Sequence, residues 1–267
     1  MNKWLFSLVV APAVLVLSAC SSESPSDTGS RLRVAATVVP HAEILEFVKP
    51  ELAKQGVELE IREFNDYVQP NSQVAQRQMD LNYFQTGPYL DEFNRDHGTH
   101  LVRIVGVHIE PLGAYSRKHK VLTALPDGGE VIVPNDPSNL GRALLLLDKA
   151  GIIKLRDRRN PVATPRDIVE NPKHLRFRQL DAAMLPRVFE QVDLAMINTN
   201  YALDAGLDPT VDALVIEDGD SPYVNYLVGR PDNQNDPRTR KLAAALTSEA
   251  VRKFIVEKYQ GAVLPAF

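Results

Sequence analysis

Five short segments of the chain combine aromatic and polar side chains, and each stands at the end of an expected strand. Aromatic rings supply apolar walls, while tyrosine and asparagine side chains supply hydrogen bonds. For any one segment, the simpler explanation is that these are ordinary loop residues. Their recurrence at the edges of the expected sheets instead favours a binding site. The segments are residues 65–68, 83–90, 135–142, 197–201 and 221–225.

The known sequence signatures of enzymes are absent. The chain contains no G-x-S-x-G, no G-x-x-x-x-G-K-[ST] and no G-x-G-x-x-G after a strand. The one cysteine, Cys20, belongs to the N-terminal signal described below, so no thiol nucleophile remains. Of the six histidines only His97 and His100 stand close together, and a metal site needs three or four converging ligands. We therefore expect no catalytic residue, no metal and no cofactor, with the histidines at the surface.

Strand and helix patterns alternate along the chain in two groups, and these elements must position the five segments. The first group opens with the apolar run 33–39, and the pattern restarts at residues 130–133. Asp136 is a good N-cap for a helix over residues 138–150, which ends before Gly151. Such alternation favours α/β lobes with mostly parallel sheets covered by helices. Ligands bind beyond the carboxyl ends of such strands, so two lobes predict one cleft between them.

The two lobes are expected to be joined by two crossings of the chain. We expect the chain to leave the first lobe near Gly113 and to return near Tyr226. The first lobe would then comprise residues 32–113 and 226–267, and the second residues 114–225. Two crossings at one boundary can act as a hinge, so we expect the lobes to close on a ligand.

The N-terminus has the pattern of a lipoprotein signal. The apolar run over residues 4–17 is shorter than the roughly 20 residues that a membrane-spanning helix needs. It leads into L-S-A-C, which resembles the lipoprotein site where a cysteine, here Cys20, receives diacylglycerol before cleavage. We expect a signal peptide over residues 1–19 and a lipidated flexible tether over residues 20–31. The body would then face the periplasm or the extracellular side of a membrane. The alternative is an ordinary secretory signal with a chance cysteine.

Composition sets wider limits on function. The 267 residues are 44% apolar and 24% charged, which is typical of a folded protein and excludes disordered, collagen-like and multi-span membrane chains. A chain of this length forms a large core and suggests two domains. The net charge of −4 argues against a nucleic-acid-binding protein, which normally carries a basic surplus.

Six motifs together resemble those of the NlpA family of lipoproteins, in the same order and with the family's spacing over essentially residues 32–267. The resemblance implies a two-lobed periplasmic binding protein of the type II-like fold that closes on free methionine, with L-methionine as the first choice. It also implies a membrane partner, an ABC importer built from a permease and an ATPase. The motifs are N-D-Y-V-x-P-N, F-Q-x-x-P-Y-L, V-P-N-D-P-x-N-x-G-R, V-E-N-P-K, I-N-T-x-Y and S-P-Y-V-N.

The resemblance also implies ligand contacts at the matching positions. The family's aromatic contacts match Tyr67, Phe84 and Tyr89, whose rings can enclose a thioether. The N-x-G-R arginine matches Arg142, whose planar fork can hold a carboxylate, helped by a nearby helix N-terminus. The alternatives are core packing for Phe84 and Tyr89 and a surface salt bridge for Arg142.

Two asparagines and a threonine complete the set of positions that the resemblance implies. Asn198 and Asn225 can offer amide oxygens to an ammonium and amide nitrogens to a carboxylate. The family commonly has F-Q-H-x-P-Y-L with a histidine contact, whereas this chain has Thr86 at that place. Threonine is shorter and cannot be cationic, so the pocket is expected to be roomier or to hold a water there.

The choice of ligand and role therefore has alternatives. D-methionine or a methionine-containing dipeptide could replace L-methionine in the same cleft. In another class of function, the chain would be a surface lipoprotein for interaction or adhesion. The combination of Arg142, Asn198 and Asn225 favours the binding component of an importer.

Overall fold

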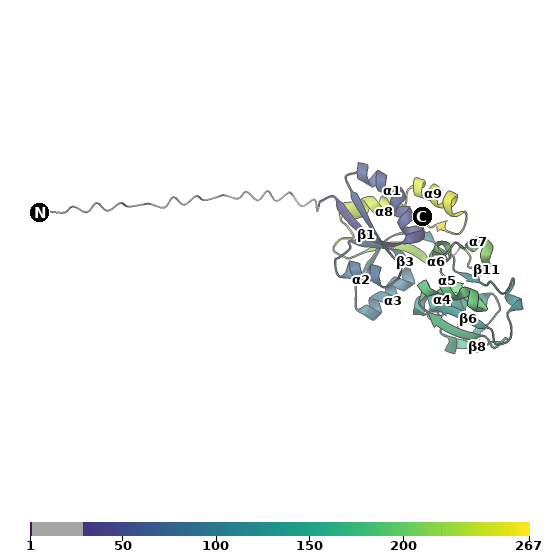
Figure 1. Ribbon diagram of the computed structural model, residues 1–267. Helices are drawn as coiled ribbons and strands as arrows, with labels where there is room; N and C mark the ends of the chain where they lie inside the picture. The colour runs from purple at the N-terminus through teal and green to yellow at the C-terminus, as the bar shows by residue number, and fades with distance from the viewer. Residues whose placement is uncertain (2–28, 220) are drawn as a thin grey trace.

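Two lobes, each built around its own sheet, make up the parts of the chain that the computed structural model describes: residue 1 and residues 29–219 and 221–267 (Figure 1). The first lobe holds a six-stranded sheet in the order β13-β4-β12-β3-β1-β2. Its strands are β1 (Arg31–Thr37), β2 (Glu58–Phe64), β3 (Leu81–Thr86), β4 (Val102–Ile109), β12 (Val224–Gly229) and β13 (Leu264–Pro265).

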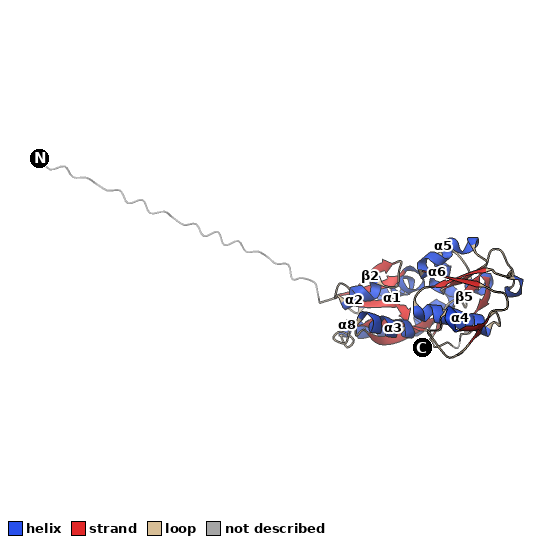
Figure 2. Cartoon of the chain, turned by 90° about the horizontal axis from the view of Figure 1, so that it is seen from below, coloured by secondary structure: helices blue, strands red, loops and turns tan. Residues whose placement is uncertain are grey.

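The second lobe holds a five-stranded sheet in the order β11-β5-β10-β6-β9 and a separate pair, β7 and β8. Seen from below, the two lobes lie side by side (Figure 2). The strands are β5 (Gly113–Tyr115), β6 (Glu130–Pro134), β7 (Lys154–Leu155), β8 (Ile168–Glu170), β9 (Arg176–Leu180), β10 (Leu194–Ile197) and β11 (Ala213–Ile216).

Helices cover the two sheets, which confirms the predicted α/β class. The first lobe contains a π-helical turn at Val38–Ala42 and the helices α1 (Glu43–Lys54), α2 (Gln69–Ala75), α3 (Gly87–His97), α8 (Pro237–Leu246) and α9 (Glu249–Tyr259). The second contains α4 (Pro137–Lys149), α5 (Leu185–Val188), α6 (Thr199–Asp204) and α7 (Pro209–Asp212). Short 3-10 turns lie at Leu122–Ala124, Pro165–Asp167, Ala182–Met184 and Phe189–Gln191.

The sheets are mixed rather than mostly parallel, which corrects the expectation of strand direction. In the first sheet β2, β1 and β3 are parallel, but β12 runs antiparallel to both β3 and β4. In the second sheet β9, β6 and β10 are parallel, and β5 runs antiparallel to β10 and β11. The reversed strands β5 and β12 are those by which the chain enters each lobe from the other. Alternation of strands and helices along the sequence does not reveal the direction in which a strand enters its sheet after such a crossing.

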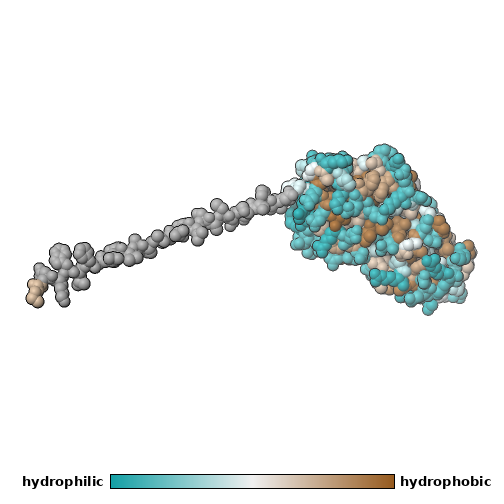
Figure 3. Space-filling model, turned by 45° about the horizontal axis from the view of Figure 1, so that its top comes forward, coloured by the Kyte–Doolittle hydropathy of each residue, from teal (hydrophilic) through white to brown (hydrophobic). Residues whose placement is uncertain are grey.

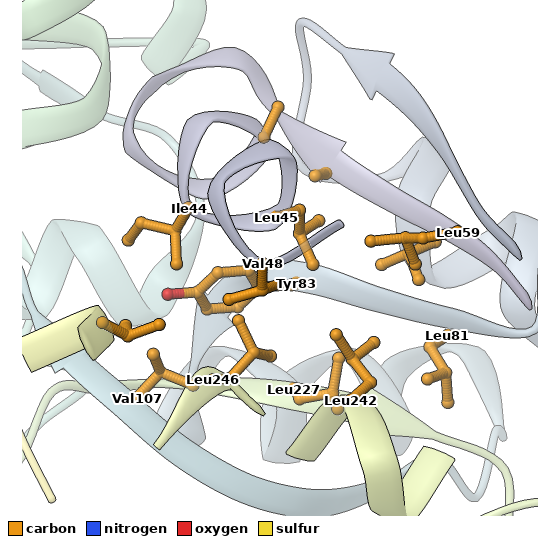
Figure 4. Packing of buried hydrophobic residues seen from close by; sticks show 14 of the residues in the cluster. Ile44, Leu45, Val48, Leu59, Leu81, Tyr83, Val107, Leu227, Leu242 and Leu246 are labelled. Carbon is orange, nitrogen blue, oxygen red and sulfur yellow. The ribbon is translucent and has the colours of Figure 1, made fainter. Parts of the chain in front are cut away.

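The core of the first lobe lies between α1, α8 and the sheet. Helical spacing puts Ile44, Leu45 and Val48 of α1 on one buried face, and Leu242 and Leu246 of α8 are also buried in this cluster (Figure 4). Separate buried clusters fill the second lobe, where α4 packs on β6. Hydrophilic residues cover most of the face shown in Figure 3.

Residues 2–19 of the predicted signal peptide and residues 20–28 of the tether, with Cys20 among them, lie outside the described residues. The last residue assigned to the tether, Arg31, is the first residue of β1. Within the described ranges, no helix combines the length and the apolar character needed to cross a membrane.

Helix α4 is held by its cap and by a close approach of backbone. As predicted, Asp136 caps the helix, because its side chain accepts a hydrogen bond from the Asn139 N–H at 2.8 Å. One turn later Gly141 faces a loop of the same lobe, and a Cβ built on it would lie 2.1 Å from the carbonyl oxygen of Pro161. Only a residue without a side chain lets this loop lie against the helix.

We expect Gly141→Ala to destabilise the protein by about 1–3 kcal/mol in chemical denaturation, because the new Cβ must displace the Pro161 backbone. In a free helix the same change would stabilise by roughly 1 kcal/mol. Gly29→Ala is the control, since its Cβ would meet nothing within 4 Å. A Gly141→Ala protein as stable as the parent would contradict the close contact.

Candidate functional site

A cavity between the two lobes brings all seven predicted ligand contacts together. It encloses about 350 Å³ that protein atoms do not fill, part of it open to solvent. The first lobe contributes the end of β3 and the start of α3, together with β12, and the second lobe contributes the N-terminal turns of α4 and α6. The lining residues are Tyr67, Phe84, Gln85, Thr86, Tyr89, Glu110, Asn139, Arg142, Asn198, Thr199, Asn200 and Asn225.

One side of the cavity is an aromatic wall. The ring centroids of Tyr67, Phe84 and Tyr89 lie 5.8–5.9 Å from one another, and the Tyr201 ring lies 5.0 Å from that of Tyr67. The hydroxyls have partners in the protein: Tyr67 donates to Asn200 Oδ1 at 2.6 Å, and Tyr89 donates to the Tyr67 carbonyl at 3.0 Å. Because the hydroxyls are occupied, this wall offers apolar ring surface. The bond from Tyr67 to Asn200 also ties the two lobes together.

Arg142 lies on the second lobe's side of the cavity, buried and already charge-paired. Its Nε donates to the two carboxylate oxygens of Glu217 at 2.8 and 3.0 Å, and its Nη2 donates to the Glu110 carbonyl at 2.7 Å. The Tyr223 ring centroid lies 4.2 Å from the guanidinium carbon. Arg142 is therefore not the surface salt bridge that was the alternative expectation. Within the described residues, Nη1 has no hydrogen-bond acceptor.

The amide of Asn198 is oriented by hydrogen bonds through Asn139 to the Asp136 carboxylate. Its Nδ2 donates to Asn139 Oδ1 at 2.8 Å, and Asn139 Nδ2 in turn donates to the Asp136 carboxylate at 3.0 and 3.1 Å. This arrangement leaves Asn198 Oδ1 buried without a hydrogen-bond partner in the described chain. A buried acceptor without a donor is costly, so the site is complete only when a donor reaches this oxygen.

A buried cluster of His41, His108 and Glu110 lies beside the cavity and was missed in the sequence. Glu110 Oε1 is 2.7 Å from His108 Nε2 and 3.1 Å from His41 Nε2. The expectation that the histidines lie at the surface is wrong for these two, which are only 1% and 0% exposed. One signal was available: His108 and Glu110 are two residues apart at the end of a strand run and so share a face.

Burial controls the charges of this cluster. It lowers the pKa of His41 to about 4 and that of His108 to about 3, because a buried imidazolium loses its hydration. Burial also raises the pKa of the Glu110 carboxyl, while the nearby charges of His41 and Arg142 and the Asn200 backbone N–H act in the opposite direction. Both imidazoles are therefore neutral at physiological pH.

The same three side chains have the donor atoms of a metal site, since one ligand atom from each lies within 4.8 Å of the others. In the structure, however, these atoms bond to one another and to hydroxyls. His41 Nδ1 lies 2.7 Å from Thr37 Oγ1, and the Tyr83 hydroxyl bonds to His108 Nδ1. A hydrogen-bonded network thus accounts for the cluster.

Asn225 and Thr86 lie next to each other on adjacent strands of the first sheet. They are paired in the antiparallel register of β12 and β3, and both line the cavity. Asn225 is 4% exposed, and its Oδ1 lies 3.2 Å from His41 Nε2, so the buried cluster reaches the cavity through this amide. Thr86 lies at the N-cap of α3, next to Gly87.

Comparison with known proteins gives consistent matches over the whole body. Residues 32–267 match the model of a family described as NlpA lipoprotein. The chain is similar to the D-methionine-binding lipoprotein MetQ of Salmonella typhi, with 41% identity over 92% of each chain. It is also similar to outer membrane lipoprotein 2 of Mannheimia haemolytica, with 38% identity over 96% of each chain. Among solved structures, the chain is similar to a nutrient binding protein from Burkholderia cenocepacia bound to methionine, with 42% sequence identity. The two superpose with a TM-score of 0.85, over 88% of this chain and 100% of the other.

One contact between the lobes depends on a carboxyl group that titrates near neutral pH. Glu92 of α3 accepts a hydrogen bond from the Ser138 backbone N–H of α4 at 2.8 Å. Burial, and secondarily the charge of Asp136, raise the pKa of Glu92 from 4.5 to about 7, although the Ser138 N–H acts in the opposite direction. Between these two values the folded protein holds more protons than the unfolded chain.

The contribution of Glu92 to stability is therefore fully present below pH 4.5 and lost as the pH rises through about 7. Glu92→Gln keeps a side-chain acceptor for the Ser138 N–H but does not titrate. We expect the free energy of unfolding of the variant, relative to the parent, to increase from about pH 5 to about pH 8 in urea denaturation. Asp91→Asn, whose wild-type side chain is 66% exposed on the same helix, is the control. A difference between Glu92→Gln and parent that is the same at every pH would contradict this assignment.

Proposed function

The chain belongs to the NlpA lipoprotein family, and from this premise we propose that it is the binding lipoprotein of an ABC importer. In this proposal it captures methionine in the cleft between its lobes and delivers it to the permease, whose ATPase drives transport. The similarity to proteins named for methionine binding supports the ligand class. An enzyme would need a nucleophile or an acid–base pair in the cleft, and the relatives are named as binding lipoproteins.

The unpartnered oxygen of Asn198 carries the proposal, because it lies in the same cavity as Arg142. A zwitterionic amino acid offers an ammonium group to this acceptor and a carboxylate to the Nη1 of Arg142. Both charges leave water when the cleft closes, so each needs a partner inside. The Glu110 carboxylate lines the cavity and is available to stabilise the ammonium charge.

The aromatic wall would hold the methionine side chain. The rings of Tyr67, Phe84 and Tyr89 present apolar surface, and a thioether makes favourable contacts with aromatic rings. Small-molecule sites combine apolar walls of this kind with a few placed polar groups, as the lining of this cavity does. An adhesion protein would have no need for charged and apolar groups arranged in this way around an enclosed space.

The stereochemistry of the ligand is the finer part of the proposal. We place L-methionine first, and D-methionine or a methionine-containing dipeptide as alternatives. Thr86 takes the place of the family's common histidine, so the cavity wall beside Asn225 carries a short, neutral side chain. With a neutral side chain at this position, Arg142 is the cationic side chain among the residues that line the cavity. This supports the proposal that the carboxylate of any of these ligands binds beside it.

The proposed movement is closure of the two lobes, with expected bounds of residues 32–113 with 226–267 and residues 114–225. The strands differ slightly at these bounds, since Gly113 begins β5 of the second sheet and Val224 and Asn225 begin β12 of the first. In the structure the chain crosses between the sheets after β4 and again between β11 and β12. Bonds such as those from Tyr67 to Asn200 and from Ser138 to Glu92 join the lobes across the cleft. Opening for ligand entry would break these contacts while the two crossings serve as the hinge.

We expect Arg142→Ala to weaken L-methionine binding by roughly 30-fold to several thousand-fold in calorimetry, because it removes the cation that partners a buried carboxylate. Arg142→Lys should recover only part of the affinity, since an ammonium cannot reproduce the planar fork or its bonds to Glu217.

Lys149→Ala is the matched control for Arg142. Lys149 lies on the same helix and pairs with Asp218, but its side chain is 63% exposed and does not line the cavity. An Arg142→Ala protein that is folded and binds L-methionine within about threefold of the parent would show that the carboxylate is held elsewhere.

Anchoring through Cys20 is a separate part of the proposal. We expect Cys20→Ala to abolish acylation and to release the protein from membranes, because several acyl chains are needed for stable attachment. Metabolic labelling with a palmitate analogue, followed by membrane fractionation, measures both effects. Ser21→Ala is the control, and a Cys20→Ala protein that still incorporates the label would rule out this anchor.

A further inference from the structure

We propose that His41 is a positioning residue that orients the amide of Asn225, so that the NH2 group of Asn225 faces the ligand carboxylate. This inference rests on the proposed function for the identity of the ligand, but its structural core is a statement about the protein alone. Asn225 lines the cavity, whereas His41 lies behind it, 1% exposed. His41 would therefore act on the ligand through Asn225 without contacting it.

The contact between the two side chains selects one orientation of the amide. His41 Nε2 lies 3.2 Å from Asn225 Oδ1, whereas Asn225 Nδ2 has no acceptor within the described residues. If Nε2 carries a proton, it donates to Oδ1 and holds that oxygen away from the ligand. The Nδ2 group is then the atom available to the cavity, and as a donor it suits a carboxylate and not an ammonium.

The proton on His41 Nε2 follows from the hydrogen bonds of its neighbours. Nε2 faces two oxygens, Asn225 Oδ1 at 3.2 Å and Glu110 Oε1 at 3.1 Å. On the other side of the ring, Nδ1 lies 2.7 Å from Thr37 Oγ1, a hydroxyl that can donate. With the proton on Nε2, the Thr37 hydroxyl donates to Nδ1, Nε2–H donates to Asn225 Oδ1, and the Glu110 carboxylate lies 3.1 Å from the same nitrogen. With the proton on Nδ1, an unprotonated Nε2 would face the two oxygens.

The same assignment satisfies the second histidine. The Tyr83 hydroxyl donates to His108 Nδ1, and His108 Nε2–H donates to Glu110 Oε1 at 2.7 Å. Glu110 also accepts from the Asn200 backbone N–H, in the second lobe. One arrangement of protons thus gives each of the four ring nitrogens of His41 and His108 a hydrogen-bond partner. This arrangement fixes the His41 ring between a hydroxyl and a carboxylate that is itself held in place.

The orientation has a consequence that depends on the ligand's charge. Without the His41 donor, the Asn225 amide can turn over and present its oxygen to the ligand carboxylate, which repels it. Loss of His41 should therefore weaken the binding of a ligand with a carboxylate more than the binding of a ligand in which a neutral amide replaces that carboxylate. A general loosening of the first lobe would weaken both ligands alike.

Calorimetry of four proteins with L-methionine and with L-methioninamide tests this consequence. His41→Leu removes the donor, and His41→Asn keeps a polar group near Thr37 that is too short to reach Asn225. His41→Gln places an NH2 group close to the position of Nε2. We expect the His41→Leu and His41→Asn variants to bind L-methionine about tenfold or more weakly than the parent, but to bind L-methioninamide less than about threefold more weakly. The His41→Gln variant should bind both ligands with an affinity close to that of the parent. Equal weakening of both ligands in the folded Leu and Asn variants, or no weakening of either, would overturn the proposal.

Long-range proton–nitrogen NMR of the ligand-free full mature chain gives a reading that does not depend on the ligand. We expect His41 as the neutral tautomer protonated on Nε2, with Asn225→Ala as the assignment control. A proton on Nδ1 would overturn the positioning role even if L-methionine binds. Conversely, if the parent did not bind L-methionine, the proposed function would be refuted. The tautomer of His41 would still decide whether His41 orients the Asn225 amide.

Discussion

The buried carboxylate of Glu110 is the constraint on which the site depends, because it stands where the chain crosses from one lobe to the other. It accepts hydrogen bonds from His108 of the first lobe and from the Asn200 backbone of the second, and it lies 3.1 Å from His41 Nε2. Its own backbone carbonyl accepts from Arg142 at 2.7 Å. A carboxylate removed from water is stable only with such partners. The interactions of this one residue therefore fix the positions of both lobes and of Arg142 relative to one another.

The polar groups of the cleft are oriented by hydrogen bonds and contacts to other side chains of the protein. Asp136 orients Asn139, which orients Asn198, and Glu217 together with the Tyr223 ring holds Arg142. The result is a fixed pattern: a buried acceptor at Asn198 and a cation at Arg142, beside an apolar wall. A site prepared in this way loses little entropy on binding, because its side chains are already held in place.

Much of this arrangement could be predicted from the sequence, and the exceptions have physical reasons. The strands, the helix beginning after Asp136 and the gathering of Tyr67, Phe84, Thr86, Tyr89, Arg142, Asn198 and Asn225 around one cavity follow from periodicity, capping and motifs. The reversal of β5 and β12 could not be predicted, because the sequence indicates where the chain crosses between lobes but not the direction in which it enters the next sheet. The partner of Arg142 is Glu217, 75 residues later, and no local pattern connects the two. His41 was expected at the surface because no sequence pattern connects it to Glu110, whereas the spacing of His108 and Glu110 along one strand was a signal that the sequence analysis missed.

A crystal structure of the protein grown with L-methionine would test the central claim most directly, namely that the cleft is built for an amino-acid zwitterion. The account predicts the ligand in the interlobe cavity, with its carboxylate on Arg142 and the Asn225 Nδ2, its ammonium on the Asn198 Oδ1, and its thioether against Tyr67, Phe84 and Tyr89. Methionine bound in the reverse orientation, with the ammonium beside Arg142, or bound outside this cavity, would contradict it.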